Sequence, residues 1–273
     1  MSGSDTSSFG ITEEDREKMR FLSENGAPGG GADLAAMMES DPDDSKQSPG
    51  RTETRERVLT APEFERLLIG ALRIDDDEHA LETWSALVIL GRLGLRAGEL
   101  GHFSIEWYDD REQILSIPEH DPCTKGRDGG ACGDCRQAAR QRISHGDDRD
   151  VEEIADEYWM PKTETAVRDI PTGWSARVEE AVLFIGQVHG EWPHAYSTLK
   201  RRLQSAIENA PLLDENATTL HGLRGTAASY HAGNGLDKEA LKQMMGWRDD
   251  KTPNKYLAIN GQMAKRALNR VYR

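Results

Sequence analysis

Apolar residues recur at helical spacing along most of the chain beyond residue 57. Residues 64–72 place a leucine or phenylalanine every three or four positions. Thr60 and Glu63 have the spacing of a capping box, with Pro62 in the first turn, so this helix is predicted to begin at Thr60. The same periodicity predicts further helices over about 79–93, 175–188, 196–209, 218–232, 237–246 and 253–271.

Two stretches alternate between apolar and polar positions instead, which is typical of strands. SIEWYDDREQILSIP predicts a β-hairpin that turns at Asp109 and Asp110. YWMPKTETAVRDIPT predicts a second hairpin that turns near Glu164. The pattern therefore predicts an α+β, mainly α domain over residues 57–273, made of helices with small antiparallel hairpins.

Residues 1–56 have a different character, because they are rich in Gly, Ser, Asp and Pro. Such a segment cannot bury enough apolar area to offset the entropy of ordering it, so we expect a disordered, acidic and Gly-rich N-terminal tail. The chain has no apolar run of membrane-spanning length, and its first residues lack the order of a signal peptide. We expect a cytoplasmic protein that does not contact a membrane.

The charge of the chain is unevenly distributed. The net charge is −14, which taken alone argues against a nucleic-acid partner. Residues 1–55 carry 12 Asp and Glu against 6 Lys and Arg, whereas residues 196–273 carry 7 acids against 13 bases. The last third is thus locally basic and suited to DNA. The acidic surplus elsewhere is typical of a salt-rich, halophilic cytoplasm, or is an ordinary acidic surface.

Six residues with suitable chemistry follow one another at telling distances. They are Arg96 in GLRAGEL, Lys162 in PKTETAVRDIP, His221 and Arg224 in LHGLRGTAAS, Trp247 in MMGWRDD and Tyr256 in TPNKYLA. Each residue alone has an ordinary structural interpretation, such as a surface arginine or a core tryptophan. Their joint order over about 160 residues is the informative feature, with 23 positions from Arg224 to Trp247 and nine more to Tyr256.

In this order the chain resembles the tyrosine recombinase, or phage integrase, family. The resemblance implies the catalytic-domain fold of that family and a 3′-phosphotyrosine intermediate formed by Tyr256. It also implies that Arg96 and Arg224 clamp the scissile phosphate and that Lys162 protonates the leaving 5′ oxygen. His221 would assist proton transfer around Tyr256. Trp247 would donate its indole N–H to the phosphate and pack against the helix that carries Tyr256.

The chemistry of phosphodiester cleavage explains why these residue types occur together. Two arginines hold phosphate oxygens in bidentate fashion and keep their charge at neutral pH. A phenol with a pKa of about 10 is a weak nucleophile, so a cationic pocket must lower its barrier. The phosphotyrosine keeps the energy of the broken bond, and the sequence has no nucleotide-binding loop. We therefore expect no cofactor in catalysis.

The expected partner is double-stranded DNA, bound by a homo-oligomer. Lys200, Arg201 and Arg202 on the helix predicted over 196–209 are candidates for contacts with the DNA backbone, or they form an ordinary exposed helix face. Two other functions stay open. One is a DNA relaxase similar to type IB topoisomerases, and the other is a catalytically inactive DNA-binding module, against which the filled catalytic positions count.

A cysteine-containing insertion at residues 119–150 lies outside the family's pattern. His120 and Cys123 are followed by Cys132 and Cys135, which gives H-x₂-C and then C-x₂-C. Such half-sites around glycine-rich turns are typical of a closed, structural Zn²⁺ knuckle. His145 or Asp134 could replace His120 as the fourth ligand, and the alternative is three free thiols in a reduced cytosol.

Overall fold

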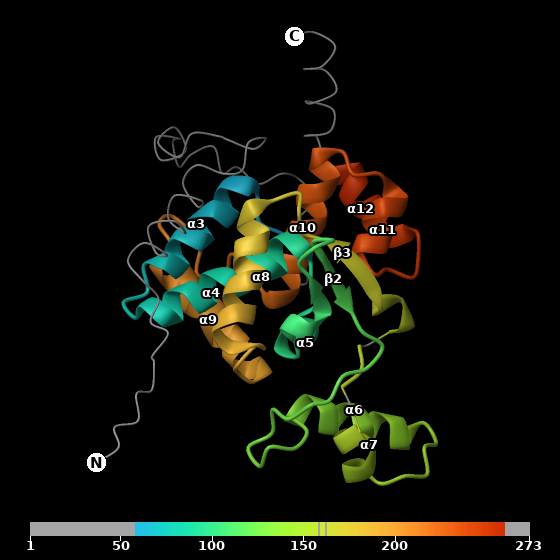
Figure 1. The fold of residues 1–273 in the computed structure, drawn as a ribbon. Helices are drawn as coiled ribbons and strands as arrows, with labels where there is room; N and C mark the ends of the chain where they lie inside the picture. The colour runs from blue at the N-terminus through green and yellow to red at the C-terminus, as the bar shows by residue number, and fades with distance from the viewer. Residues whose placement is uncertain (1–57, 158, 162, 260–273) are drawn as a thin grey trace, which may run out of the picture.

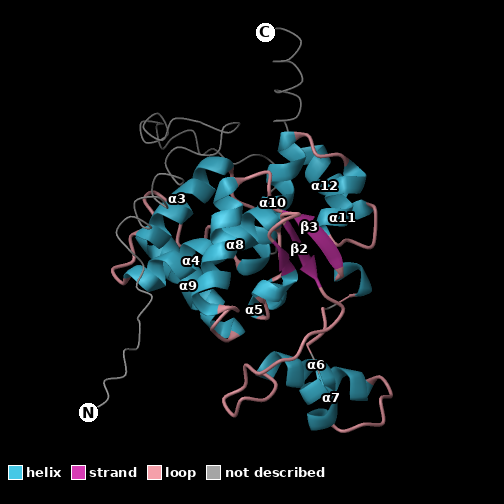
Figure 2. Ribbon diagram, in the orientation of Figure 1, coloured by secondary structure: helices cyan, strands magenta, loops and turns pink. Residues whose placement is uncertain are grey.

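The computed structural model describes residues 58–157, 159–161 and 163–259, so the tail predicted over residues 1–56 lies outside the described residues. The fold is mainly helical with one small sheet, which confirms the predicted fold class (Figure 1; Figure 2). The α-helices are α3 (Ala61–Leu72), α4 (Asp77–Val88), α5 (Ala97–Gly101), α6 (Gly133–Ser144), α7 (Val151–Glu157), α8 (Ala176–His189), α9 (Tyr196–Asn209), α10 (Leu220–Asn234), α11 (Lys238–Met245) and α12 (Lys251–Ile259). The strands are β1 (Tyr108–Asp109), β2 (Ile114–Ile117) and β3 (Arg168–Pro171), and the short helical turns are η2 (Ile89–Leu93), η3 (Ile105–Trp107) and η4 (Glu164–Ala166).

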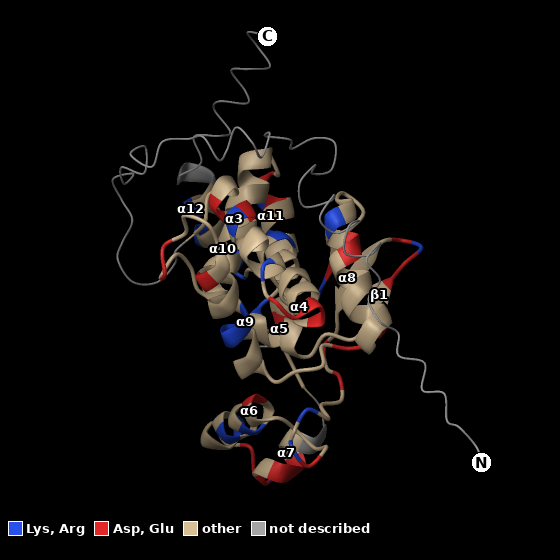
Figure 3. Ribbon diagram, turned by 90° about the vertical axis from the view of Figure 1, so that its left-hand side faces the viewer, with Lys and Arg blue, Asp and Glu red and all other residues tan. Residues whose placement is uncertain are grey.

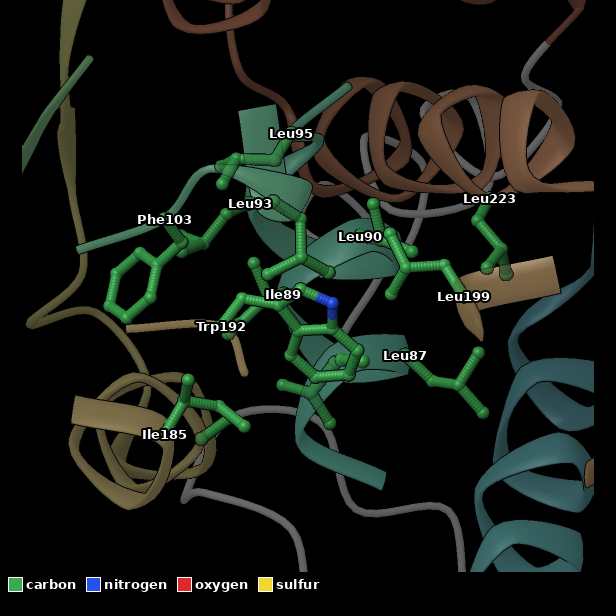
Figure 4. Packing of buried hydrophobic residues seen from close by; sticks show 14 of the residues in the cluster. Leu87, Ile89, Leu90, Leu93, Leu95, Phe103, Ile185, Trp192, Leu199 and Leu223 are labelled. Carbon is green, nitrogen blue, oxygen red and sulfur yellow. The ribbon is translucent and has the colours of Figure 1, made fainter. Parts of the chain in front are cut away.

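α4 and η2 form one continuous helix at the centre of the molecule. Every residue from 80 to 95 is buried, as expected for a helix that is covered on all sides. Ile185, Leu199 and Leu223 bring α8, α9 and α10 against it (Figure 4). The last five residues, η2, take the wider π-helical form and end at Gly94, whose φ is 68°. This turn delivers the chain to residues 94–99, which contribute to the candidate site.

The three strands form one antiparallel sheet in the order β1, β2, β3. β1 and β2 are joined as the predicted first hairpin, with Tyr108 opposite Leu115. The predicted second hairpin is wrong, because β3 pairs along its length with β2, Ile117 lying opposite Arg168. The buried residues of β3 lie opposite buried residues of β2, and the pairing provides backbone hydrogen-bond partners for both strands. Residues 118–157 leave the sheet between β2 and β3 and form what we call the inserted lobe (Figure 1).

The helices predicted from periodicity are confirmed within the described residues, and their caps explain their limits. Thr60 and Glu63 make both hydrogen bonds of the predicted capping box. The helices α5, α6 and α7 were not predicted, because α5 has only five residues and α6 lacks an apolar stripe. None of the helices in the described ranges is long and apolar enough to cross a membrane.

The packing of α10 on η2 should make stability sensitive to mild acid. His231 is buried, and its Nε2 lies 2.7 Å from the carbonyl oxygen of Arg92. Burial lowers the pKa of His231 to about 4, against the opposing effect of this hydrogen bond. As the pH falls, the His231 imidazole is therefore protonated in the unfolded chain before it is protonated in the folded chain. The stability that neutral His231 contributes above pH 6.5 is lost as the pH falls towards 4. Between pH 7 and pH 5 the loss is about 2 kcal/mol.

Urea unfolding at pH 7 and pH 5 measures this loss. The His231→Gln variant should lose about 2 kcal/mol less than the wild type on acidification. His145→Gln is the matched control, because His145 is exposed and its replacement should leave the wild-type pH dependence in place. Equal slopes for the wild type and His231→Gln would show that His231 does not stay neutral in the folded chain.

Candidate active site

α10 carries Arg224 near its N-terminal end. The Thr219 side chain accepts a hydrogen bond from the Gly222 N–H at 3.0 Å, which caps the helix and sets where it begins. Arg224 is buried, and its two Nη groups donate to the backbone carbonyls of Gly94 and Met245. Its guanidinium is therefore held between the end of η2 and the end of α11.

Arg96 caps the short helix α5 and is tied to Glu99. The Arg96 backbone N–H donates to Glu99 Oε2 at 2.7 Å, and its Nη1 donates to Glu99 Oε1 at 2.7 Å. Its Nη2 reaches the carbonyl oxygen of Gly246 at 3.2 Å. The Arg96 side chain is 22% exposed, whereas that of Glu99 is 1% exposed. Arg96 thus extends from a buried carboxylate towards the surface, where a substrate can meet it.

Arg168 on β3 is a third arginine of the site, which was not predicted from the sequence. Its Nη1 and Nη2 donate to the two carboxylate oxygens of Glu99 at 3.1 Å and 3.0 Å, and its Nε donates to the carbonyl of Met244 at 2.8 Å. Arg168 and Ile170 are the buried positions of an alternating strand. A charged residue at an inward position of a strand is the signal that could have identified it.

The C-terminal end of α11 gathers these three residues, which we call the arginine cluster. Three consecutive carbonyls, those of Met244, Met245 and Gly246, accept hydrogen bonds from Arg168, Arg224 and Arg96 respectively. Carbonyls in the last turn of a helix lack partners within the helix and carry its negative dipole end, so they suit cations. Gly246 has a φ of 58°, and a Cβ there would lie 2.6 Å from the Thr165 carbonyl oxygen.

The site carries an excess of positive charge. Burial, together with the nearby Arg96 and Arg168 guanidiniums, lowers the pKa of Arg224 to about 9, against the attraction of Glu99. Burial acts to raise the pKa of Glu99, but the neighbouring guanidiniums, Arg168 first, hold it below its usual value. Three guanidiniums surround one carboxylate, so the cluster favours a bound anion.

Tyr256 on α12 lies against the start of α10. Its ring stacks in parallel on that of Trp247, with centroids 5.3 Å apart and an interplanar angle of 5°. A Cβ placed on Gly225 would lie 3.4 Å from the Tyr256 hydroxyl oxygen, so this oxygen lies beside the residue that follows Arg224. Tyr256 and Arg224 also interact electrostatically. The structure therefore brings the phenol and the arginine cluster together.

The remaining predicted catalytic residues differ in how they can be placed. His221 is exposed on the first turn of α10, three positions before Arg224, and residues three apart on a helix are neighbours on its surface. Lys162 lies outside the described residues.

The predicted DNA-backbone contacts on α9 need one correction. Lys200 and Arg201 are exposed, and α9 is visibly basic (Figure 3). Arg202 is buried instead, where it donates to the Glu82 carboxylate and, at 3.2 Å, to the carbonyl of His79. Arg202 follows the buried Leu199 at helical spacing and so points inward. It serves the core and does not face a DNA backbone.

The predicted metal ligands also need a correction. Cys123, Cys132 and Cys135 lie together, but the histidine that joins them is His102, at the end of α5. His120 is exposed and is not one of this group. Asp134 and His145, the two alternatives, are exposed as well. The sequence pattern could not reveal His102, which is separated from the cysteines by the whole of the first hairpin.

Comparison with known proteins agrees with this fold. The family model described as the Phage integrase family matches residues 57–263. The integrase of the Tn1549 transposon, solved in complex with a circular intermediate DNA, is 18% identical with a TM-score of 0.54, over 82% of this chain and 68% of that one. The crystal structure of XerA recombinase is 15% identical with a TM-score of 0.51, over 84% of this chain and 67% of that one. No curated protein matches the chain.

The fold and the extent of the family match define the class of enzyme, a site-specific DNA recombinase. The chain belongs to the phage integrase family. DNA is accordingly its substrate and binding partner.

Proposed function

We propose that Tyr256 cuts one DNA strand by attacking the scissile phosphorus and that the chain then joins the strand to a new 5′ hydroxyl. The observation that carries this proposal is the convergence of three side chains around the end of α11. Arg96 and Arg224 both donate to carbonyls there, and the Tyr256 hydroxyl lies beside Gly225 on the adjoining turn of α10.

Arg96 is partly exposed and Arg224 is buried, and both bind the scissile phosphate. Each guanidinium has five N–H donors, and the side chains of Arg96 and Arg224 each use two of their nitrogens on partners among the described residues. Donors therefore remain for the non-bridging phosphate oxygens. Arg168 instead binds Glu99 through both Nη groups and is a positioning residue, since it fixes the carboxylate that orients Arg96.

The reaction balances with the residues of the chain. Tyr256 Oη forms a bond to phosphorus and loses its proton, while the bond from phosphorus to the 5′ oxygen breaks and that oxygen gains a proton. His221 assists the transfer at the phenol, and Lys162 supplies the proton at the leaving oxygen. Trp247 keeps the ring of Tyr256 oriented through their parallel stacking. Attack by another 5′ hydroxyl on the 3′-phosphotyrosine reverses the sequence and needs no nucleotide.

The substrate requires more than one copy of the chain. Joining two duplexes by strand exchange breaks four strands, and each chain supplies one Tyr256, so a homo-oligomer assembles on the DNA. Lys200 and Arg201, exposed on α9, contact the phosphate backbone and position the protein without selecting a sequence.

The test is to trap the covalent intermediate. A pool of duplexes with random central sequence, each nicked so that the cleaved fragment diffuses away, is incubated with the full chain without ATP. We expect a protein–DNA adduct that survives denaturation, with the DNA on the peptide that contains Tyr256. Sequencing the trapped DNA then defines two-site substrates, whose exchange products distinguish recombination from simple relaxation. An adduct on another residue, or none with any sequence of the pool, contradicts the proposal.

A further inference from the structure

Four buried side chains with sulfur or nitrogen ligand atoms come together, one from the end of α5 and three from the inserted lobe. His102 lies at the end of α5, Cys123 in the loop after β2, Cys132 at the N-cap of α6 and Cys135 in its first turn. One ligand atom of each lies within 4.8 Å of all the others. Each side chain is less than a tenth exposed, so this is an interior cluster.

The distances within the cluster fit a tetrahedral zinc ion. His102 Nε2 lies 3.5 Å from Cys132 Sγ and 3.3 Å from Cys135 Sγ. Tetrahedral zinc, with bonds of about 2.3 Å to sulfur and about 2.05 Å to nitrogen, separates two such ligands by about 3.6 Å. These two distances are therefore close to those between ligands of one zinc ion, and the remaining ligand atoms lie within 4.8 Å of one another.

The orientation of His102 is also that of a metal ligand. Its Nδ1 lies 2.8 Å from the carbonyl oxygen of Gly98, so Nδ1 carries the proton and Nε2 presents its lone pair to the cysteines. Histidines that bind metals are usually held by a hydrogen bond of this kind. One lone pair can accept a hydrogen bond from only one of two thiols at similar distances, whereas one cation explains why both approach it.

We propose that His102, Cys123, Cys132 and Cys135 bind a structural Zn²⁺ ion. Four protein ligands complete the tetrahedron, so the ion has no open position for a substrate. Three thiolates and a neutral imidazole suit zinc better than they suit the harder cations that prefer oxygen.

The ion holds the inserted lobe to the rest of the fold. The buried core residues of the lobe are cysteines and alanines apart from Ile154, and its two helices are oppositely charged, α6 basic and α7 acidic (Figure 3). A segment of this kind is marginal without a cross-link. Trp159, on the return from the lobe, stacks on His102 with centroids 4.9 Å apart and on Trp107 with centroids 5.4 Å apart. The zinc site and this aromatic stack close the lobe at its base.

The site also reaches the proposed catalytic residues through α5. His102 ends this five-residue helix, and Arg96 and Glu99 form the capping box at its beginning. Loss of zinc should therefore disturb Arg96 as well as the lobe. This coupling rests on the proposed function, whereas the binding of zinc does not.

Metal analysis of the purified full chain tests the zinc site. We expect one zinc per chain in the wild type and little in His102→Ala or in Cys132→Ser with Cys135→Ser. His120→Ala is the matched control and should keep its zinc, because His120 is exposed. Wild-type protein in which Co²⁺ replaces zinc should show the intense visible absorption of a tetrahedral thiolate site, independently of any variant's folding. Metal-free wild type that binds neither added Zn²⁺ nor added Co²⁺ would overturn the site.

Adduct formation tests the coupling to α5. Removal of zinc with a chelator should lower the rate of adduct formation by roughly 10- to 100-fold, and added zinc should restore it. An unchanged rate after zinc loss overturns the coupling and leaves the zinc site standing. A wild type that holds zinc but forms no adduct contradicts the proposed function instead, so the two failures are distinguishable.

Discussion

Replacing Tyr256 with phenylalanine should abolish the covalent protein–DNA adduct and leave folding and DNA binding intact. The change removes a single oxygen atom, and the remaining ring keeps its parallel stacking on Trp247 at 5.3 Å. Because the attacking atom is lost, adduct formation should fall by on the order of 10⁴-fold or more. The affinity for DNA should stay within about twofold, since the contacts with phosphates are unchanged. Denaturing gels measure the first effect and fluorescence anisotropy the second.

Tyr196→Phe is the matched control for this prediction. Tyr196 lies on α9 and is 41% exposed, far from the arginine cluster in sequence and unconnected to it by any described hydrogen bond. This variant should form the adduct at the wild-type rate. If Tyr256→Phe still forms an adduct at that rate, the nucleophile is another residue.

Replacing Glu99 with alanine should destabilise the fold by about 3–5 kcal/mol. Glu99 is the carboxylate that compensates Arg96 and Arg168, and the Arg168 side chain is only 4% exposed. Removing it leaves a buried guanidinium without its counter-charge, which costs far more than the loss of a surface ion pair. Equilibrium unfolding in urea at pH 7 measures the change in the free energy of unfolding.

Two further variants separate charge from shape at this position. Glu99→Gln keeps the shape of the side chain but removes its charge. Its free energy of unfolding should therefore lie between those of the wild type and the alanine variant. Glu215→Ala removes an exposed carboxylate and should change stability by less than about 0.5 kcal/mol. A loss below about 1 kcal/mol in Glu99→Ala would mean that Arg168 does not depend on this carboxylate.

Most of the helices and several residues of the site could be predicted from the sequence because their signals are local. Capping residues such as Thr60, and glycines such as Gly94, mark where helices begin and end within a few positions. The spacing of Arg224, Trp247 and Tyr256 depends on the consecutive helices α10, α11 and α12. These three helices contact one another, so the positions of the three residues depend mainly on nearby parts of the chain.

The features that escaped prediction depend on partners far away in the chain. Arg168 meets Glu99 across 69 positions, and Arg202 meets Glu82 across 120 positions. Neither pairing produces a pattern among neighbouring residues of the sequence. For this reason the sequence predicts Arg202 to be exposed like Lys200 and Arg201. His102 approaches the cysteines only because the antiparallel sheet returns the chain to α5. The pairing of β3 with β2 across the inserted lobe escaped for the same reason.

The end of α11 connects the residues proposed to bind the phosphate with the helix that carries the nucleophile. Its carbonyls hold all three guanidiniums by main-chain atoms, and α12, with Tyr256, begins only a few residues later at Lys251. Only residues 246–250 separate the end of α11 from α12, so a shift of α12 would also displace those carbonyls. The position of the nucleophile and the placement of the three guanidiniums therefore depend on the same short stretch of main chain.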